Sequence, residues 1–237
     1  MDLIDYKHGL TEDFWYFKLK EDLIRRVIPK NFKKIIFVGS GVIKIPSYLR
    51  NKEITLLDKN KNTLNLCKRI NNNKKIKLIH KKIEQVSNMN QKFDVVIITD
   101  VLEHIKKPRR AISSMKNILK KNGLLIVYVP ANQKLFTDRD KQFGHYRRYT
   151  KQRMISEFAD LKIKYLGYHL FFLYPFIYLS KRIIKKSNIK PLFHKSKILN
   201  FLVYKVLQIE NICIQKKLKL PIGSQLLLIA QKTTTKP

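Results

Sequence analysis

Two glycines and an aspartate are the first residues whose types and spacing suggest chemistry. Gly39-Ser40-Gly41 follows one short apolar run, and Asp58 ends the next run, 17 positions after Gly41. Glycines let backbone amides approach a ligand closely where a turn opens into a helix, and a carboxylate at the end of the second strand of such a unit accepts ribose hydroxyls. The glycine fingerprint of proteins that bind nicotinamide dinucleotides needs a third glycine at position 44, where this chain has Lys44. A nicotinamide dinucleotide is therefore not the favoured ligand. The pattern indicates a ligand of adenosine type, or else only a tight turn and a solvated strand end.

The elements that must position these residues appear as short apolar runs alternating with amphipathic segments. Five β-branched runs predict strands at residues 33–39, 53–58, 76–80, 93–98 and 123–129. Between the last two, residues 108–121 carry apolar side chains at helical spacing, and Asn122-Gly123 is expected to end that helix. This alternation is typical of an α/β fold with a mostly parallel sheet. We expect one domain over residues 1–237, with an elaboration toward its C-terminal end.

Four passages of the chain resemble one family, the class I S-adenosylmethionine-dependent methyltransferases, and within it a bacterial group with a long aromatic and basic signature. They are FWYFK at 14–18, FDVVIITDVLEHI at 93–105, GHYRRYT at 144–150 after Val129-Pro130-Ala131, and PIGSQ at 221–225. The resemblance spans residues 14–231. It implies a Rossmann-like seven-stranded sheet, with two further strands at 162–167 and 225–231 and the last one inserted antiparallel. It also implies an N-terminal aromatic helix at 10–30, a core at 33–168 and a helical insertion at about 170–220.

The same resemblance implies S-adenosylmethionine as the cofactor and assigns its contacts. Gly39 and Gly41 would lie under the methionine part, and Asp58 would hold the ribose. Thr99, Asp100 and Val101 would border the sulfonium at the end of the fourth strand, because open α/β sheets bind ligands beyond the carboxyl ends of their strands.

The chain departs from the family pattern at five positions. Phe37 replaces an acidic residue, Ile43 replaces the last glycine of the turn, and Lys82 replaces an aspartate at the adenine. Lys18 and Lys20 stand where arginine is usual, and lysine cannot form a two-pronged contact with a carboxylate. Two interpretations follow: a methyltransferase with an altered cofactor site, or a noncatalytic partner protein with the same fold.

Methyl transfer also requires a place for the acceptor's proton, and two histidines are candidates. His104 follows Glu103 after the fourth strand, and His145 lies in GHYRRYT. A histidine titrates near neutral pH, so either one is suited to act as a base. The alternative is that residues 102–104 only cap the next helix.

Arg147, Arg148 and Tyr149 form a predicted grip for an anionic acceptor. Two guanidinium groups flanked by aromatic rings suit a carboxylate or a phosphate. In the alternative interpretation, the two arginines pair with Asp138 and Asp140 and pin the loop.

The net charge of the chain and the apolar stretch at residues 165–180 bear on which partners the protein binds. The chain has 50 Lys and Arg against 17 Asp and Glu, a net charge of +33, although the excess of Lys, Asn and Ile is also what an AT-rich genome produces. Residues 165–180 carry no charge but fall short of the roughly 20 needed to cross a bilayer, and Lys181, Arg182, Lys185 and Lys186 follow. Residues 198–214 have helical apolar spacing. Docking on anionic lipid is one interpretation, and helices that cover the sheet or form a dimer are the other.

These features predict a methyltransferase for a small or lipid-linked polar acceptor at the inner face of a bacterial membrane. No RNA-binding motif accompanies the charge, so an RNA methyltransferase or RNA binder is the less favoured alternative. Only Cys67 and Cys213 are present, without Cys/His clusters at metal spacing or an N-terminal signal segment. A cytoplasmic protein without a metal site is therefore expected, and the sequence does not indicate an oligomeric state.

Overall fold

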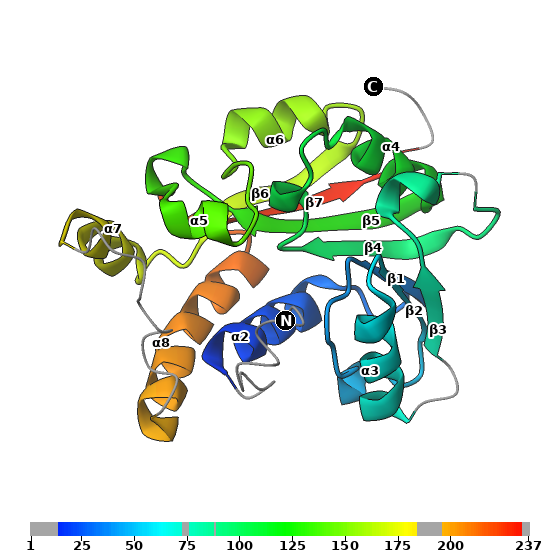
Figure 1. Ribbon diagram of the computed structural model, residues 1–237, viewed down its shortest axis with the longest axis horizontal. Helices are drawn as coiled ribbons and strands as arrows, with labels where there is room; N and C mark the ends of the chain where they lie inside the picture. Colours follow the sequence, from blue (N-terminus) through cyan, green and yellow to red (C-terminus); the bar gives the residue numbers. More distant parts are fainter. Residues whose placement is uncertain (1–13, 73–75, 88, 184–195, 234–237) are drawn as a thin grey trace.

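The chain forms a seven-stranded mixed sheet with helices on both faces in a computed structural model that describes residues 14–72, 76–87, 89–183 and 196–233 (Figure 1). The strands are β1 (Lys34–Val38), β2 (Glu53–Asp58), β3 (Ile76–His80), β4 (Phe93–Thr99), β5 (Leu119–Pro130), β6 (Lys162–His169) and β7 (Gln225–Gln231). Their order across the sheet is β3-β2-β1-β4-β5-β7-β6. Strand β7 runs antiparallel to both of its neighbours, as predicted, and the pairings among β1 to β5 are parallel.

In the described part of the chain, six longer helices flank the sheet and are joined by short helical turns. They are α2 (Trp15–Val27), α3 (Lys61–Asn71), α4 (Arg109–Ile118), α6 (Lys151–Glu157), α7 (Tyr174–Ile183) and α8 (Lys197–Gln215). The shorter ones are α5 (Asp138–Gln142) and the 3₁₀ turns η1 (Ser47–Leu49), η2 (Ile83–Gln85), η3 (Leu102–His104) and η4 (Gln133–Leu135). Within the described residues, none of these helices is both long enough and apolar enough to cross a membrane.

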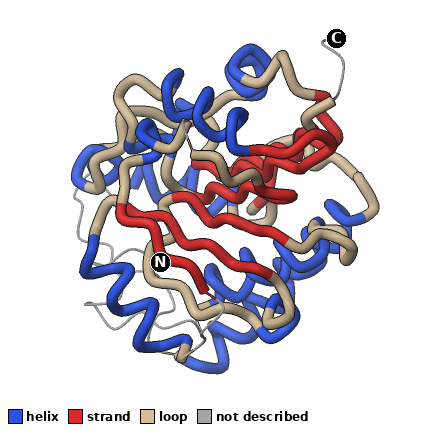
Figure 2. Tube along the Cα trace, turned by 90° about the vertical axis from the view of Figure 1, so that its right-hand side faces the viewer, coloured by secondary structure: helices blue, strands red, loops and turns tan. Residues whose placement is uncertain are grey.

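Side-chain alternation along the strands produces two apolar cores, one on each face of the sheet. On β1, Ile36 and Val38 belong to the core covered by α4 and α6, whereas Ile35 and Phe37 belong to the core covered by α2 and α3. Successive strand residues point to opposite faces, so strands that are apolar throughout must be covered on both sides. Figure 2 shows strands between helices on either side. The α/β class predicted from the sequence is confirmed.

The helix predicted at 108–121 is shorter than expected, and its predicted end signal was wrong. Helix α4 ends at Ile118, and strand β5 begins at once with Leu119, which is buried and pairs with Phe93. Asn122 takes a left-handed backbone conformation (φ +60°) inside β5, where its N–H donates to the Lys232 carbonyl. Burial of Leu119 and pairing with β4 thus prevailed over the local tendency of Asn-Gly to terminate a helix.

A second expectation also failed, because the glycine turn does not open into an α-helix. Between Val38 and Glu53, all described, the backbone forms a loop with only the single 3₁₀ turn η1. Pro46 lies within this connection, and proline disfavours a helical conformation in the residue before it. The crossover from β1 to β2 consequently lacks the long helix that would cover this part of the sheet.

Candidate functional site

The Gly39-Ser40-Gly41 turn lies at the carboxyl end of β1 and needs both glycines. Gly39 and Gly41 adopt φ angles of +60° and +57°, a region that side-chain-bearing residues rarely enter. A Cβ on Gly39 would come within 2.5 Å of Val101 Cγ2. Val101 follows β4, so two of the residues predicted to border one ligand are packed against each other.

Side chains of α3 hold the loop that replaces the missing helix. The Asn71 Nδ2 group donates to the Ile43 carbonyl at 2.9 Å, and the Ile45 N–H donates to Asn71 Oδ1 at 2.6 Å. The Cys67 thiol donates to the Gly41 carbonyl at 3.2 Å. These bonds satisfy backbone groups that a helix would have paired within itself, so the loop keeps a defined shape.

Asp58 ends β2 and reaches back to the glycine turn. Its Oδ2 accepts the Gly41 N–H at 3.0 Å, and its Oδ1 accepts the Asn60 N–H at 2.9 Å. A carboxylate has about four acceptor positions, so each oxygen retains capacity after these two bonds. Asp58 therefore fixes the turn, and the same carboxylate is placed beside the loop that a nucleoside would approach.

A cavity of about 430 Å³ lies between α2 and the loop after β1. Its lining includes Phe17, Lys20, Phe37, Gly39, Ile43 and Thr99. Pockets for small molecules commonly have volumes of about 300–1,000 Å³. Phe37 and Ile43, which replace an acid and a glycine of the family pattern, line this space and do not fill it. Lys82 is exposed outside it, with its N–H donating to Gln85 Oε1.

The aromatic N-terminal helix is bound to the end of β4. The Tyr16 hydroxyl lies 3.0 Å from each oxygen of Asp100, and Lys20 Nζ lies 2.6 Å from Asp100 Oδ2. The Gln225 Nε2 group, at the start of β7, donates to the same Tyr16 hydroxyl at 3.1 Å. Asp100 has a φ of +55°. This network fixes the residue after Thr99, and its Lys20 also lines the cavity.

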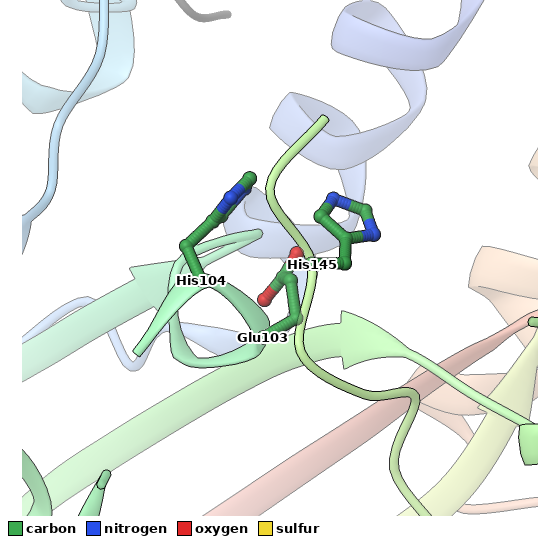
Figure 3. A group of neighbouring side chains, drawn as sticks. All are labelled: Glu103, His104 and His145. Atoms are coloured by element: carbon green, nitrogen blue, oxygen red, sulfur yellow. The ribbon is translucent and has the colours of Figure 1, made fainter. Parts of the chain in front are cut away.

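Glu103, His104 and His145 come together at the exits of β4 and β5. Each of the three offers a ligand atom within 4.8 Å of the others, and the two imidazole rings meet edge to face at 4.6 Å between centroids. Figure 3 shows the Glu103 carboxylate directed toward the two rings. Glu103 is 0% exposed, and neither of its carboxylate oxygens has a hydrogen-bond partner in the described part of the chain. Burial, followed by the nearby charge of Asp100, raises the pKa of the Glu103 carboxyl well above its usual value.

The loop that carries His145 is tied to its surroundings by Asp140. Asp140 Oδ1 lies 3.0 Å from His145 Nδ1 and accepts the Arg148 Nε–H at 2.9 Å. Burial alone would raise the pKa of Asp140, but the bonds from His145 and Arg148 hold it well below the usual value. Arg148 thus pins the loop, as one of the two sequence interpretations predicted.

The other two residues of the predicted anion grip have separate environments. Arg147 is partly exposed, and its Nη2 donates to the Lys106 carbonyl at 2.8 Å. Tyr149 is fully buried in the core beneath α6, and no described residue hydrogen-bonds to its hydroxyl. Asp138 pairs with Lys141 at 2.9 Å and does not take part in holding an arginine.

Sequence reasoning did not identify Glu103, Tyr16 or Lys20 as members of these clusters. Glu103 stood beside a candidate base, but its complete burial is a tertiary feature, and a loop distant in sequence packs beside it, where the Tyr146 N–H donates to the Glu103 carbonyl. The aromatic run at 14–18 was a usable signal for Tyr16. Its partner Asp100 lies 84 positions away, and no periodicity connects the two.

Comparisons with known proteins agree with this architecture. Residues 37–127 match a family described as a methyltransferase domain. An uncharacterized protein of Methanocaldococcus jannaschii is 25% identical over 154 residues, which cover 65% of this chain and 67% of that protein.

Many solved structures resemble the chain over most of its length, and two of them illustrate the likeness. An S-adenosylmethionine-dependent methyltransferase of Thermotoga maritima has a TM-score of 0.60 at 12% identity, covering 98% of this chain and 96% of the other. The N-methyltransferase NodS of Bradyrhizobium japonicum, in complex with S-adenosylhomocysteine, has a TM-score of 0.52 at 12% identity, covering 90% and 83%. The chain therefore has the Rossmann-like seven-stranded fold of the class I S-adenosylmethionine-dependent methyltransferases.

Proposed function

We propose that this protein is an S-adenosylmethionine-dependent methyltransferase that acts on a small or lipid-linked polar acceptor. One observation carries the proposal: Gly39 and Thr99, from the ends of two neighbouring parallel strands, line the same 430 Å³ cavity. Ligands of open α/β sheets bind beyond the carboxyl ends of the strands. The methyltransferase domain match at residues 37–127 and the bound S-adenosylhomocysteine of NodS support the choice of cofactor.

Of the residues predicted to contact the cofactor, Gly39 and Thr99 line the cavity, whereas Gly41, Asp58, Asp100 and Val101 are not part of its lining. At Gly39 a Cβ would come within 2.5 Å of Val101 Cγ2, so only a glycine fits where the end of β1 meets the residues after β4. Asp58 retains acceptor capacity for ribose hydroxyls beside Gly41, and Thr99, Asp100 and Val101 follow one another at the proposed sulfonium position. When bound, the cofactor supplies an electrophilic methyl group on positive sulfur. The chain's own task is to orient the acceptor and to exclude water.

The acceptor side of the site is proposed at the cluster of His104 and His145. An imidazole there would accept the proton that the acceptor loses. Arg147, which is partly exposed, would contact an anionic group on the acceptor, with Arg148 and Tyr149 fixing the loop behind it. Both histidines keep partial exposure, so an acceptor can reach them from solvent.

A lipid-linked acceptor is supported by the apolar surface of α7 and α8. Phe176 is 70% exposed and Ile198 is 75% exposed, and Phe201, Leu202, Val206 and Ile209 are exposed along α8. Apolar helix faces on a chain of charge +33 suit the cytoplasmic face of an anionic membrane. Of the predicted basic cluster, Lys185 and Lys186 lie outside the described residues.

Titration calorimetry with S-adenosylhomocysteine tests the cofactor. We expect one binding site per chain, and we expect Asp58→Asn to weaken it by about tenfold, since one hydrogen bond to a charged group contributes about 1.5 kcal/mol or more. Asp138→Asn, an exposed aspartate on α5, is the matched control. Binding no tighter than that of adenosine alone would favour the noncatalytic partner protein, and a defined RNA footprint would favour the RNA alternative.

Flotation with vesicles tests the membrane part separately. The protein should float with phosphatidylglycerol vesicles and not with phosphatidylcholine vesicles, and Phe201→Ser together with Ile209→Ser should abolish flotation. The same double variant should still bind S-adenosylhomocysteine. Equal flotation of the wild-type protein and the double variant would contradict the lipid-linked acceptor while leaving the methyltransferase proposal intact.

A further inference from the structure

The cluster of Glu103, His104 and His145 has the donor set of a metal centre. Glu103 and His104 come from the turn η3 after β4, and His145 comes from the loop after α5 (Figure 3). One ligand atom from each side chain lies within 4.8 Å of the other two, so side-chain rotation can bring all three onto one ion, whose bonds to nitrogen and oxygen are about 2.0–2.2 Å long. We propose that these three side chains bind a divalent first-row transition metal ion of the Zn²⁺ type. The inference concerns binding, and it does not depend on the methyl-transfer function.

The state of Glu103 is the first argument for an ion. The side chain is 0% exposed, and no described residue supplies a hydrogen bond to either carboxylate oxygen. Burying a carboxylate without a partner is costly, and native structures pair such groups or use them to coordinate metals. A purely structural glutamate at this position would be less favourable than an apolar residue of the same size. A cation beside the carboxylate removes this cost.

The orientation of His145 is the second argument. Its Nδ1 lies 3.0 Å from Asp140 Oδ1, and Asp140 is held in turn by the Arg148 Nε–H and by the Thr137 N–H at 2.8 Å. A histidine that binds a metal ordinarily donates its other ring N–H to a carboxylate, which fixes the tautomer and the ring. With Nδ1–H donated to Asp140, the lone pair of Nε2 remains available for an ion. Asp140 is therefore a positioning residue for this ligand.

The backbone fixes the distance between the two segments. The Tyr146 N–H donates to the Glu103 carbonyl at 2.8 Å, and the His145 N–H donates to the Asp140 carbonyl at 2.8 Å. The loop with His145 is thus tied at adjacent residues to the turn with Glu103 and to helix α5. The backbone around the three side chains is therefore ordered before an ion binds, and binding needs only side-chain adjustment.

The donor types select the ion. Two imidazole nitrogens and one carboxylate oxygen suit Zn²⁺, Co²⁺, Ni²⁺ or Fe²⁺, whereas Mg²⁺ and Ca²⁺ prefer oxygen ligands only. Three protein ligands with partial exposure at His104 and His145 leave a position open, as in catalytic zinc sites. A ring nitrogen that binds a metal cannot also accept a proton. Metal ligand and general base are therefore alternative roles for the same nitrogen.

Cobalt titration tests the site directly and needs no methyl acceptor. The full chain, carrying no histidine tag and stripped of metal, is titrated with Co²⁺, whose visible d–d bands report a site of low coordination number. We expect one Co²⁺ per chain, displacement by one equivalent of Zn²⁺, and no displacement by Mg²⁺ at a large excess. Absence of these bands together with no retained Zn²⁺ after gel filtration would overturn the proposal.

Variants connect the spectrum to the three residues. Glu103→Gln and His145→Gln should each weaken Co²⁺ binding by more than tenfold, and Asp140→Asn by about 10-fold to 100-fold through loss of ligand orientation. Asp138→Asn, on the same helix, and His80→Gln, at the end of β3, are the matched controls and should keep wild-type affinity. Unchanged affinity in Glu103→Gln and His145→Gln would refute the assignment.

A stability measurement distinguishes lost binding from misfolding. In the metal-free protein Glu103→Gln should be at least as stable as wild type, because it removes a buried carboxylate that has no partner. Zn²⁺ should raise the melting temperature of wild type and of the two controls, but not of Glu103→Gln. A metal-free Glu103→Gln variant that is markedly less stable than wild type, with Zn²⁺ stabilising both equally, would indicate a structural glutamate and no metal site.

Discussion

Lys20 Nζ lies 2.6 Å from Asp100 Oδ2, so an ion pair joins helix α2 to the residue that follows β4. The two residues lie 80 positions apart in the chain. The lysine also sits 4.6 Å from the centre of the Tyr16 ring, and the Tyr16 hydroxyl contacts the same carboxylate. Helix α2 therefore does more than cover the sheet, because it fixes the backbone beside the proposed sulfonium position.

This pair should contribute measurably to stability. The Lys20 and Asp100 side chains are 11% and 26% exposed, so breaking the pair leaves a charge that water compensates only in part. We expect Lys20→Met and Asp100→Asn each to lower the free energy of unfolding by about 2 kcal/mol. The double variant should lose less than the sum of the two by about 1 kcal/mol or more. Urea unfolding of all four proteins measures this, and strictly additive losses would contradict it.

Gly39 and Gly144 both have a positive φ, yet they should respond differently to alanine. In Gly39→Ala the added Cβ is strained by the φ of +60° and also comes within 2.5 Å of Val101 Cγ2. We therefore expect the free energy of unfolding to fall by about 3 kcal/mol and cofactor binding to be lost. Gly144 has a φ of +75°, but its nearest neighbour would be His104 Nδ1 at 3.8 Å, an ordinary contact. Gly144→Ala should therefore lower the free energy of unfolding by only about 1 kcal/mol. Equal losses in thermal or urea unfolding would show that the Val101 contact is unimportant.

Asn71 should be needed for the shape of the loop after β1. Its side chain accepts from the Ile45 N–H and donates to the Ile43 carbonyl. In Asn71→Ala these backbone groups lose their hydrogen-bond partners. We expect the free energy of unfolding to fall by about 2 kcal/mol and the backbone amides of residues 41–45 to exchange hydrogen faster. Asn65→Ala, at an exposed position of the same helix, serves as the control. Unaltered exchange over the loop in Asn71→Ala would argue that something else holds it.

His169 should make stability depend on pH. It is fully buried, its Nδ1 lies 2.7 Å from the Tyr128 hydroxyl, and burial lowers its pKa from 6.5 to about 3. Glu210 Oε2 lies 4.0 Å from Nε2, and burial raises the pKa of Glu210, so burial favours the neutral form of both groups.

The unfolded chain therefore binds a proton on His169 that the folded chain excludes between about pH 6.5 and pH 3. The stability that the neutral imidazole provides is complete above pH 6.5 and decreases as the pH falls through this window. Urea unfolding at about pH 7 and about pH 4.5 should show a smaller decrease in His169→Gln than in wild type. Nitrogen-detected NMR should find the wild-type ring neutral at the lower pH, and a charged ring there would disprove the assignment.

The sequence by itself determined five of the seven strands of the described sheet, although not all of their bounds. Runs such as Glu53–Asp58 and Ile76–His80 are apolar, β-branched and bounded by charged or turn residues, and the structure forms strands over these ranges. The antiparallel strand Gln225–Gln231 required the family resemblance, because an apolar run does not carry its own direction. The turn predicted at Gly39-Ser40-Gly41 from residue type does form, with positive φ at both glycines.

The tertiary structure decided the features that depend on distant partners. Asn122-Gly123 lies in a strand because Leu119 is buried against β4, and the loop after Gly41 keeps its shape because Cys67 and Asn71 satisfy its backbone. Glu103 and His145 are 42 positions apart, and only the folding of the α5 loop onto the turn η3 brings them together. The burial of a side chain and the electrostatics of a site depend on many neighbouring residues. The order of residues along the chain does not reveal which residues these are. The local pattern therefore determined the sheet, and three-dimensional packing determined which side chains meet at its edge.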